Sequence, residues 1–329
     1  MNIDQLKQQF PTEASCRDFF EAIMWPEGRI CPHCSSKKSY IISCKTARVG
    51  LYQCGKCHRQ FSVTTKTPMH STKLCLWKWI LAMYCMVNSS KGVSSVIMAK
   101  WIGVSQKTAW KICHAIRELM RPSNPEKPLL KNIVELDEKY IGGKPRYQNG
   151  ITHKPGKATE KQCVFVAVER QGPVCSALID SDRAAEISPV VNGFVEKSAH
   201  LMTDHNKAYL KIGQQFASHR WVNHSEKEYA RGDVHNNTAE SFNALLERAK
   251  MGVFHYLSKK HLQRYIHEIG FRWNHREPVK KKSAKGEEKI IMKPLPVMDM
   301  IVSVLRRAAG RQIRRSAKGG ILIFDQAFA

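Results

Sequence analysis

Three carboxylates that are far apart in the sequence each lie at the end or edge of a predicted core element. Asp137 falls within VELDEKYIGGK (134–144), an apolar run typical of a half-buried strand, although acidic residues are depleted in strands and rarely buried unpaired. Asp204 follows another apolar run, and Glu240 lies in the first turn of a predicted helix. Hard divalent cations prefer oxygen ligands, and two of them about 4 Å apart can activate an attacking oxygen and stabilise a leaving one. We therefore expect Asp137 to bridge two Mg²⁺ ions, with Asp204 and Glu240 each holding mainly one. Mn²⁺ can replace Mg²⁺ in such a site. Taken singly, each acid could instead be a structural carboxylate.

Four of the eleven cysteines have a spacing that suits zinc. Cys31-x-x-Cys34 is followed, after nineteen residues, by Cys54-x-x-Cys57. Two such pairs, each in a tight turn, close a tetrahedral thiolate site, which predicts a zinc ribbon over about residues 28–65. The ribbon is too small to have much core, so the metal is expected to hold it folded. Disulfides are the alternative, and His33, His58 or Cys44 could replace one ligand.

The elements around the carboxylates predict an α/β domain. Strands are expected at 132–141, 162–170, 174–180 and about 199–203, with a helix at 184–197 and another beginning near Thr238. Three consecutive strands, a helix and a further strand favour an antiparallel meander feeding a mixed sheet. Asp137 would then lie within the first strand and Asp204 just beyond the fourth, with Glu138 pointing to the opposite face from Asp137.

A helical region precedes this domain. Residues 71–87 have apolar positions at helical spacing, with Ser71 or Thr72 as the expected N-cap. In the following segment, 92–120, Ser94-Ser95 and Ser105 can each cap a helix, and Gly103 makes the turn between them. This pattern predicts a helix-turn-helix, although an ordinary helical hairpin fits it too. In the helix-turn-helix reading, four residues would face DNA: Gln106, Lys107, Thr108 and Lys111.

Composition indicates a polyanionic partner. The 329 residues carry a formal net charge of +25 and a pI of about 9.7. The longest uncharged apolar run, Trp79–Val87, is far short of a membrane span, and the N-terminus lacks the apolar core of a signal peptide. We therefore expect a cytoplasmic protein that binds double-stranded DNA and not membranes.

Several blocks of this sequence resemble a known family. VELDEKYIGGK, LMTDHNKAY, VHNNTAESF and SKKHLQRYIHEIGFRWNHR are similar to the signature blocks of zinc-ribbon DDE transposases of bacterial insertion sequences, the group numbered fifteen-ninety-five. TPMHSTKLCLWKWILAMY and SQKTAWKICHAIRELM resemble the N-terminal half of the same group, so the likeness runs from about residue 17 to 276. It implies an RNase H-like catalytic fold, Mg²⁺-dependent cleavage at the ends of a mobile element, and joining of the 3′-hydroxyls to target DNA. A bacterial, nucleoid-associated protein that acts as a homodimer or higher oligomer on DNA is expected.

The resemblance also assigns roles and exposes two departures. Asp137, Asp204 and Glu240 correspond to the catalytic set, and Asn237 of the Asn-x-x-Glu motif is a second candidate for the third ligand. Relatives typically carry Lys at the position of Glu247 here, which leaves Arg248 and Lys250 as the candidate DNA-contacting cations. Relatives also tend to have Trp where this chain has Asn243, and that change is expected to affect packing alone.

The expected division of the chain has six parts. They are an N-terminal helical segment (1–27), the zinc ribbon (28–65), a helical region with the helix-turn-helix (66–120), a linker (121–131), the catalytic domain (132–278) and a basic tail (279–329). The tail has twelve basic against four acidic residues. It fits either a solvated charged end or an arm that binds phosphates non-specifically through residues such as Arg314. Its apolar runs, 297–305 and 321–324, indicate that part of it folds or docks on a partner chain.

Taken together, the motifs predict a transposase that binds the terminal inverted repeats of an insertion sequence, cleaves the element ends and joins them to a target. Two other classes compete. One is a zinc-ribbon regulator that binds DNA without catalysis, in which the acids are structural. The other is an RNase H-like nuclease that cuts and never joins.

Overall fold

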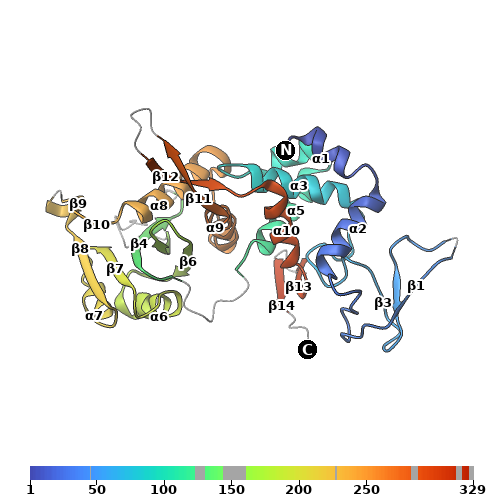
Figure 1. The fold of residues 1–329 in the computed structure, drawn as a ribbon, viewed down its shortest axis with the longest axis horizontal. Helices are drawn as coiled ribbons and strands as arrows, with labels where there is room; N and C mark the ends of the chain where they lie inside the picture. The colour runs from blue at the N-terminus through green and yellow to red at the C-terminus, as the bar shows by residue number, and fades with distance from the viewer. Residues whose placement is uncertain are drawn as a thin grey trace, which may run out of the picture. The chain divides into compact units, whose positions relative to one another are not determined.

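A computed structural model describes residues 1–44, 46–122, 130–143, 161–226, 228–282, 288–315 and 321–325. The chain separates into two compact units (Figure 1). The first unit contains residues 1–89, 93–120 and 295–329, and the second contains residues 90–92 and 121–294. Most of the expected linker and the basic loop that follows Gly143 lie outside the described residues. Nowhere in the described ranges is a helix long and apolar enough to cross a bilayer.

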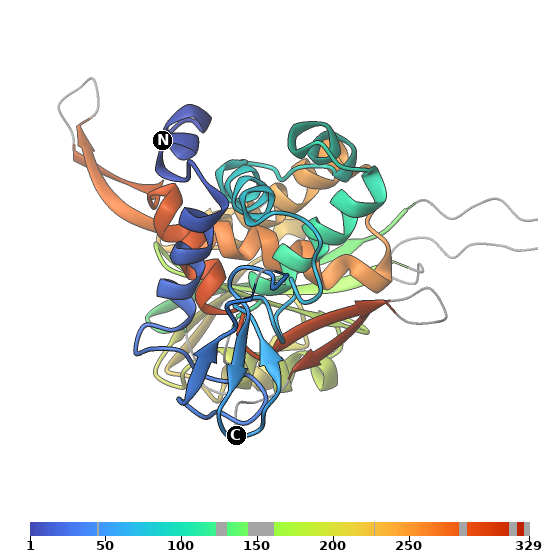
Figure 2. The ribbon, with the colours of Figure 1, turned by 90° about the vertical axis from the view of Figure 1, so that its right-hand side faces the viewer.

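The first unit begins with two capped helices and a small sheet. Helices α1 (Ile3–Gln9) and α2 (Glu13–Met24) start at the capping residues Asn2 and Thr12. Strands β1 (Ser39–Ile41), β2 (Tyr52–Cys54) and β3 (Gln60–Phe61) form an antiparallel sheet, seen in Figure 2. Its core is a few aromatic rings, in which Trp25 meets Tyr52 and Phe61 edge-on. So little apolar burial agrees with a ribbon that depends on a metal.

Three helices follow: α3 (Leu76–Asn88), α4 (Ser95–Ile102) and α5 (Gln106–Leu119). Ser94 and Ser105 cap α4 and α5 as predicted, and Gly103 adopts the left-handed conformation (φ +61°) between them. The expected N-cap of α3 was wrong, because this helix begins at Leu76. The Glu13 carboxylate of α2 caps it instead, accepting a hydrogen bond from the Leu76 N–H at 2.8 Å.

The last part of the chain completes the first unit. Helix α10 (Val297–Arg306) buries its apolar stripe against α2 and α3. Strands β13 (Arg311–Arg315) and β14 (Ile321–Asp325) then form an antiparallel pair. The prediction that the apolar runs of the tail are folded is therefore confirmed. Only the backbone of Arg314 is described, so its expected role in DNA binding stays a prediction.

The second unit is built on a five-stranded mixed sheet in the order β6-β5-β4-β7-β8. Strands β4, β5 and β6 are the antiparallel meander, whereas β4, β7 and β8 are parallel, which confirms the predicted mixed α/β sheet. The strand bounds are β4 (Ile133–Ile141), β5 (Gln162–Glu169), β6 (Val174–Ile179), β7 (His200–Asp204) and β8 (Ser218–Val222).

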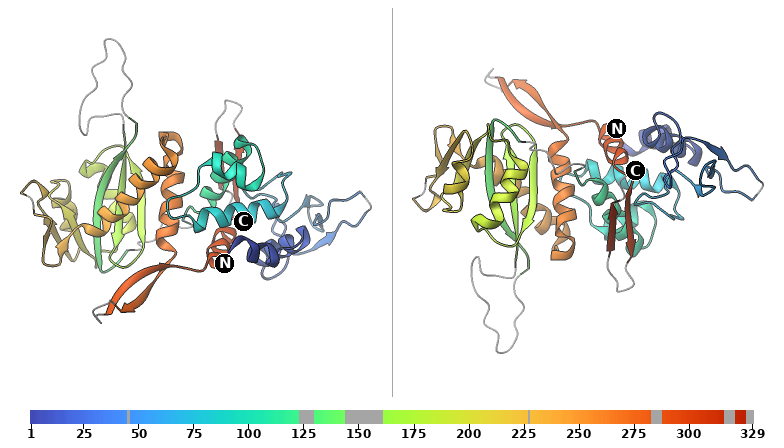
Figure 3. Two further views of the ribbon diagram at one scale, coloured as in Figure 1. Left: turned by 90° about the horizontal axis from the view of Figure 1, so that it is seen from above. Right: turned by 90° about the horizontal axis from the view of Figure 1, so that it is seen from below.

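Helices cover both faces of this sheet, as Figure 3 shows. Helices α6 (Ala184–Phe194) and α7 (Tyr209–Gly213) pack on one face, and α8 (Asn237–Ala249) and α9 (Lys259–Asn274) pack on the other. The predicted helix 184–197 ends at Phe194, because the following residues become extended and Val195 bridges to Leu130. The smaller elements of the unit are η2 (His224–Glu226), β9 (Ala230–Arg231), β10 (Val234–His235), η3 (Lys250–Phe254), β11 (Arg276–Lys282) and β12 (Glu288–Pro294).

Candidate active site

The four cysteines of the predicted zinc site lie together. Their sulfur atoms are all within 4.8 Å of one another, with Cys31 Sγ 3.7 Å from Cys57 Sγ and Cys34 Sγ 3.5 Å from Cys54 Sγ. A tetrahedral zinc ion with Zn–S bonds of about 2.3 Å separates its sulfurs by about 3.8 Å, so the cluster fits zinc. None of the eleven cysteines forms a disulfide in the structure, and the arrangement of these four favours zinc over the disulfide alternative.

The cysteine cluster has the backbone donors that thiolates need. The N–H groups of Lys56 and Cys57 both point at Cys54 Sγ, at 3.3 and 3.5 Å. The hydrogen bond from Cys57 lowers the pKa of Cys54 to about 6, whereas burial raises that of Cys31 to about 12. A cation at the centre of the cluster would stabilise the ionised form of both sulfurs.

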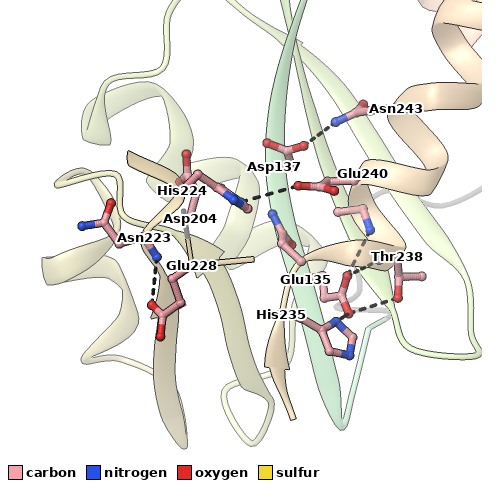
Figure 4. A network of polar contacts seen from close by, with 12 residues as sticks. Glu135, Asp137, Asp204, Asn223, His224, Glu228, His235, Thr238, Glu240 and Asn243 are labelled. Atoms are coloured by element: carbon pink, nitrogen blue, oxygen red, sulfur yellow. Dashed lines mark hydrogen bonds and ion pairs between the residues drawn. The ribbon is translucent and has the colours of Figure 1, made fainter. Parts of the chain in front are cut away.

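Asp137 and Glu240 face each other across the strand–helix interface of the second unit. Asp137 is on the face of β4 that α8 covers, since alternate β4 residues contact opposite helical layers. Its Oδ1 accepts the N–H of Glu138 at 2.9 Å, and its Oδ2 accepts the amide N–H of Asn243 at 2.7 Å. Figure 4 shows the Asp137 carboxylate beside that of Glu240, which projects from the first turn of α8.

Asp204 completes the predicted set at the end of β7. Its Oδ1 accepts the N–H of Asn206 at 3.3 Å, a short turn that holds the carboxylate where the strand stops. Burial, together with the nearby charges of Asp204 and Glu240, raises the pKa of Asp137 to about 6. The three carboxylates therefore repel one another through space, although the structure does not bring their oxygens within 4.8 Å as it does the cysteine sulfurs.

A cation suits this carboxylate group. Hard oxygen donors come together in this group, and Asp204 and Glu240 both act on Asp137 as like charges that raise its pKa. Beside Asp137, the Oδ1 atom of Asn243 is buried and has no hydrogen-bond partner among the described residues. A group of carboxylates next to a buried carbonyl oxygen without a partner among the described residues is a donor set that suits a divalent cation.

The expectation that Asn243, where relatives tend to have Trp, affects packing alone was wrong. Asn243 lies one turn after Glu240 on α8 and hydrogen-bonds a predicted metal ligand. Glu247, at the other departure from the relatives, is within ion-pair distance of Lys250 (3.5 Å) and Lys139 (4.0 Å). Arg248 is exposed, so it is the more accessible of the two cations expected to meet DNA.

Sequence reasoning overlooked Glu135, which lies two residues before Asp137 on the same face of β4. Its side chain is fully buried and accepts hydrogen bonds from the backbone N–H groups of Thr238 (2.6 Å) and Ala239 (3.1 Å). These are orphan donors of the first turn of α8, which the N-cap residue Asn236 leaves without a side-chain bond. Arg170 Nε donates to the same carboxylate at 2.6 Å. Glu135 therefore fastens to β4 the helix that carries Glu240.

Two further contacts fix the start of α8. Asn236 donates its side-chain N–H to the carbonyl oxygen of Leu136 at 2.9 Å, and His235 Nδ1 lies 3.3 Å from the Glu135 carboxylate. His224, also missed, has its Nε2 atom 3.5 Å from Glu240 Oε1. Asn237, the other candidate for the third ligand, is exposed at the first position of α8, one turn before Glu240. Glu135 could have been found from the sequence, because acids at positions 135 and 137 recur on one face of a predicted strand. His224 could not, because nothing in the sequence around it indicates its contact with Glu240.

Glu138 lies on the other face of β4, as predicted. It accepts a hydrogen bond from the hydroxyl of Tyr209 in α7. Burial raises the pKa of Glu138 to about 8, so this carboxyl is mostly protonated at neutral pH.

The residues predicted to read DNA lie at the start of α5. Lys107 and Lys111 are exposed. The amide of Gln106 donates to the Ser95 hydroxyl at 2.8 Å, and the Thr108 hydroxyl lies 2.9 Å from that of Ser105 within the helix cap. These contacts give Gln106 a fixed direction and Thr108 a structural part in the cap.

Two family models match this chain, one over the cysteine cluster and one over the unit that carries the carboxylates. Residues 11–60 match the family described as transposase zinc-ribbon domain, and residues 129–274 match the ISXO2-like transposase domain of the IS1595 group. A protein of the transposable element ISH50 from Halobacterium salinarum, itself uncharacterised, is 28% identical over 277 residues, which are 80% of this chain and 91% of that protein.

Solved structures resemble this chain only distantly. The Mos1 strand transfer complex is 14% identical, with a TM-score of 0.22 over 60% of this chain and 76% of that chain. The pre-cleavage Mos1 transpososome is 16% identical, with a TM-score of 0.22 over 59% of this chain and 76% of that chain. The family matches, by contrast, fall in order on the cysteine cluster and on the unit that carries the carboxylates, and together they span more than half of the residues. The chain therefore belongs to the zinc-ribbon ISXO2-like transposases of insertion sequences.

Proposed function

We propose that this protein binds the terminal inverted repeats of its insertion sequence, cleaves the element ends by two-metal phosphodiester hydrolysis and joins the freed 3′-hydroxyls to target DNA. The observation that carries the proposal is the coupling of Asp137 to Asp204 and Glu240, three acids from β4, β7 and α8 that share one end of a mixed sheet. The strand order, with an antiparallel meander leading into parallel strands, is consistent with an RNase H-like domain.

In this proposal Asp137, Asp204 and Glu240 hold Mg²⁺, or Mn²⁺ in its place, and Asn237 is the alternative third ligand. Two bound cations would supply an activated nucleophilic oxygen at neutral pH and neutralise the charge that develops on the leaving oxygen. Glu135 and Asn236 hold α8 at a fixed distance from β4, so that Glu240 keeps its place opposite Asp137. Asn243 orients the Asp137 carboxylate through its amide N–H.

The remaining modules would select and hold DNA. Gln106 and Lys107, at the start of the proposed recognition helix α5, would read base edges, with Thr108 and Lys111 on the same helix. Arg248 and Lys250 of the second unit, and Arg314 of the first, would contact phosphates. The zinc site is closed by four cysteines, which suits a structural role separate from catalysis. Because joining requires two ends and a target, we propose that a homodimer or higher oligomer forms on DNA.

A single assay separates this function from its two competitors. Purified protein is mixed with Mg²⁺, a labelled duplex that carries the element end, and an unlabelled target plasmid. We expect strand cleavage at the end and labelled plasmid that contains the joined end. Cleavage without joined product would favour the nuclease, whereas specific binding without cleavage would favour the regulator.

A further inference from the structure

Strands β11 and β12 form a two-stranded antiparallel ribbon that belongs to no larger sheet among the described residues. Their register runs from Arg276 opposite Pro294 to Lys282 opposite Glu288. Seven residues per strand at about 3.4 Å per residue give a length of about 24 Å. Figure 3 shows the ribbon leaving the end of α9 as a separate pair of strands.

The ribbon is exposed on both faces. Ile290 is 48% exposed and Ile291 is 37% exposed, and as neighbours on one strand they point to opposite faces. A hairpin of two strands buries too little apolar surface to be stable by itself in water. Exposed isoleucines on both faces of such a hairpin indicate that a partner covers it.

The charge of the ribbon indicates what that partner is. Lys280, Lys281, Lys282 and Lys293 are all exposed. The three consecutive lysines alternate between faces, so both faces are basic. Glu288 offsets one of these charges, because its carboxylate lies 3.4 Å from Lys280 Nζ. Glu277 is a second exposed acid of the ribbon, so the basic residues still outnumber the acidic ones. This positive charge on both faces favours a polyanion that can approach both faces at once.

The base of the ribbon is tied to the helices that cover the carboxylate site. The guanidinium of Arg276 lies over the ring of Trp273 at 3.7 Å and donates to the Trp273 carbonyl oxygen at 2.9 Å. Trp273 in turn packs edge-on against Phe242 of α8, two residues after Glu240. The first residue of the ribbon is therefore packed against a side chain that contacts the helix carrying a proposed metal ligand.

We propose that the β11–β12 ribbon enters the major groove of the duplex that this protein processes edge-on, so that its two faces meet the two groove walls. The lysines of each face would then contact the phosphates of one wall, and Ile290 and Ile291 would each be covered by the wall that their own face meets. The major groove of B-DNA is about 12 Å wide and admits a two-stranded ribbon. This inference rests on the proposed function, because that function identifies the duplex. What it adds is that the β11–β12 ribbon of the second unit contacts the major groove.

The test compares the full-length wild type with the variant Lys280→Gln/Lys281→Gln/Lys282→Gln. Binding to a labelled element-end duplex is measured without divalent cation at several salt concentrations. Each lost phosphate contact reduces the slope of log K against log salt by about 0.9, so the slope should fall in magnitude by about 2 to 3. Protection of guanine N7 atoms from dimethyl sulfate, which reports on the major groove, should disappear over one segment.

Two further variants make the outcome specific. The charge-matched control Lys7→Gln/Lys207→Gln/Lys211→Gln removes three other exposed lysines and should keep the slope and the protection of the wild type. Ile290→Thr/Ile291→Thr should keep the slope and weaken binding about tenfold. An unchanged slope in the ribbon variant, or unchanged N7 protection, would overturn the groove assignment. Because no cleavage is needed, a wild type that shows ribbon-dependent binding and never cuts DNA would refute the proposed function and leave this inference standing.

Discussion

Two acids on one face of β4 show how the surroundings of a residue decide its role. Glu135 is surrounded by donors, including the Arg170 guanidinium and two backbone N–H groups of α8. Asp137, two residues further on, lies near two other acids, Asp204 and Glu240, and its pKa is raised to about 6. The first is a satisfied structural anion, whereas the second is repelled by its neighbouring carboxylates. The sequence shows both acids and cannot tell them apart, because the partners of Glu135 lie 35 to 104 positions further along the chain.

The anchoring role of Glu135 predicts a large loss of stability in Glu135→Gln. The change removes a buried charge and leaves the Arg170 guanidinium without its counter-ion, which we expect to lower the free energy of unfolding by about 2 to 4 kcal/mol. Urea unfolding followed by circular dichroism measures it. Glu226→Gln, an exposed change in the same unit, is the matched control and should alter stability by less than about 0.5 kcal/mol. Equal stabilities of the two variants would show that Glu135 does not hold α8.

At the scale of elements, local signals were reliable and long-range ones were not. The serine caps of α4 and α5, the glycine turn between them and the strands of the mixed sheet follow from short patterns, and they are present. The start of α3 was misplaced because its cap comes from Glu13, sixty-three residues earlier. The contact of Asn243 with Asp137 was missed for the same reason, since it depends on how α8 packs on β4.

The three-stranded ribbon of the first unit should depend on zinc while the carboxylate site does not. Cys34→Ser removes one ligand from a cluster with little other core, so β1–β3 should unfold and binding to element ends should weaken. Mg²⁺-dependent cutting of non-specific DNA should persist. Cys44→Ser, which changes an exposed cysteine outside the cluster, should have neither effect. Zinc content, circular dichroism and nicking assays distinguish the variants, and loss of all nicking in a folded Cys34→Ser protein would contradict the separation.

For the whole molecule, the buried acids make stability depend on pH when no metal is present. The folded-state pKa values of Asp137, about 6, and Glu138, about 8, both exceed the ordinary values of 3.8 and 4.5. A raised pKa means that the folded state binds its proton more tightly. The stability that each proton contributes is therefore complete below the ordinary pKa and is lost as pH rises through about 6 and then about 8.

The metal-free protein should accordingly become less stable between about pH 4 and pH 8, and Asp137→Asn should remove the part of this loss that falls between about pH 4 and pH 6. The shift of Asp137 corresponds to at most about 3 kcal/mol. Added Mg²⁺ should restore stability to the wild type at pH 8, because a ligand of the folded state shifts the equilibrium, and should do less for Asp137→Asn. Urea unfolding with EDTA or with Mg²⁺ measures both effects. Parallel pH profiles for the two proteins would show that Asp137 is not coupled to the other acids.

The most direct test of the central claim compares two adjacent carboxylates on opposite faces of β4. Asp137→Asn removes a proposed metal ligand, whereas Glu138→Gln replaces a carboxyl that is mostly protonated at neutral pH with a neutral group of the same shape. Cleavage and joining of labelled element ends are measured in Mg²⁺ with folded, DNA-binding protein. We predict that Asp137→Asn binds ends and loses both reactions by more than about 10²-fold, the scale of removing a group that stabilises transition-state charge, while Glu138→Gln stays within about tenfold of the wild type. An Asp137→Asn protein that still cuts at nearly the wild-type rate, or a Glu138→Gln protein that is the inactive one, would contradict the assignment.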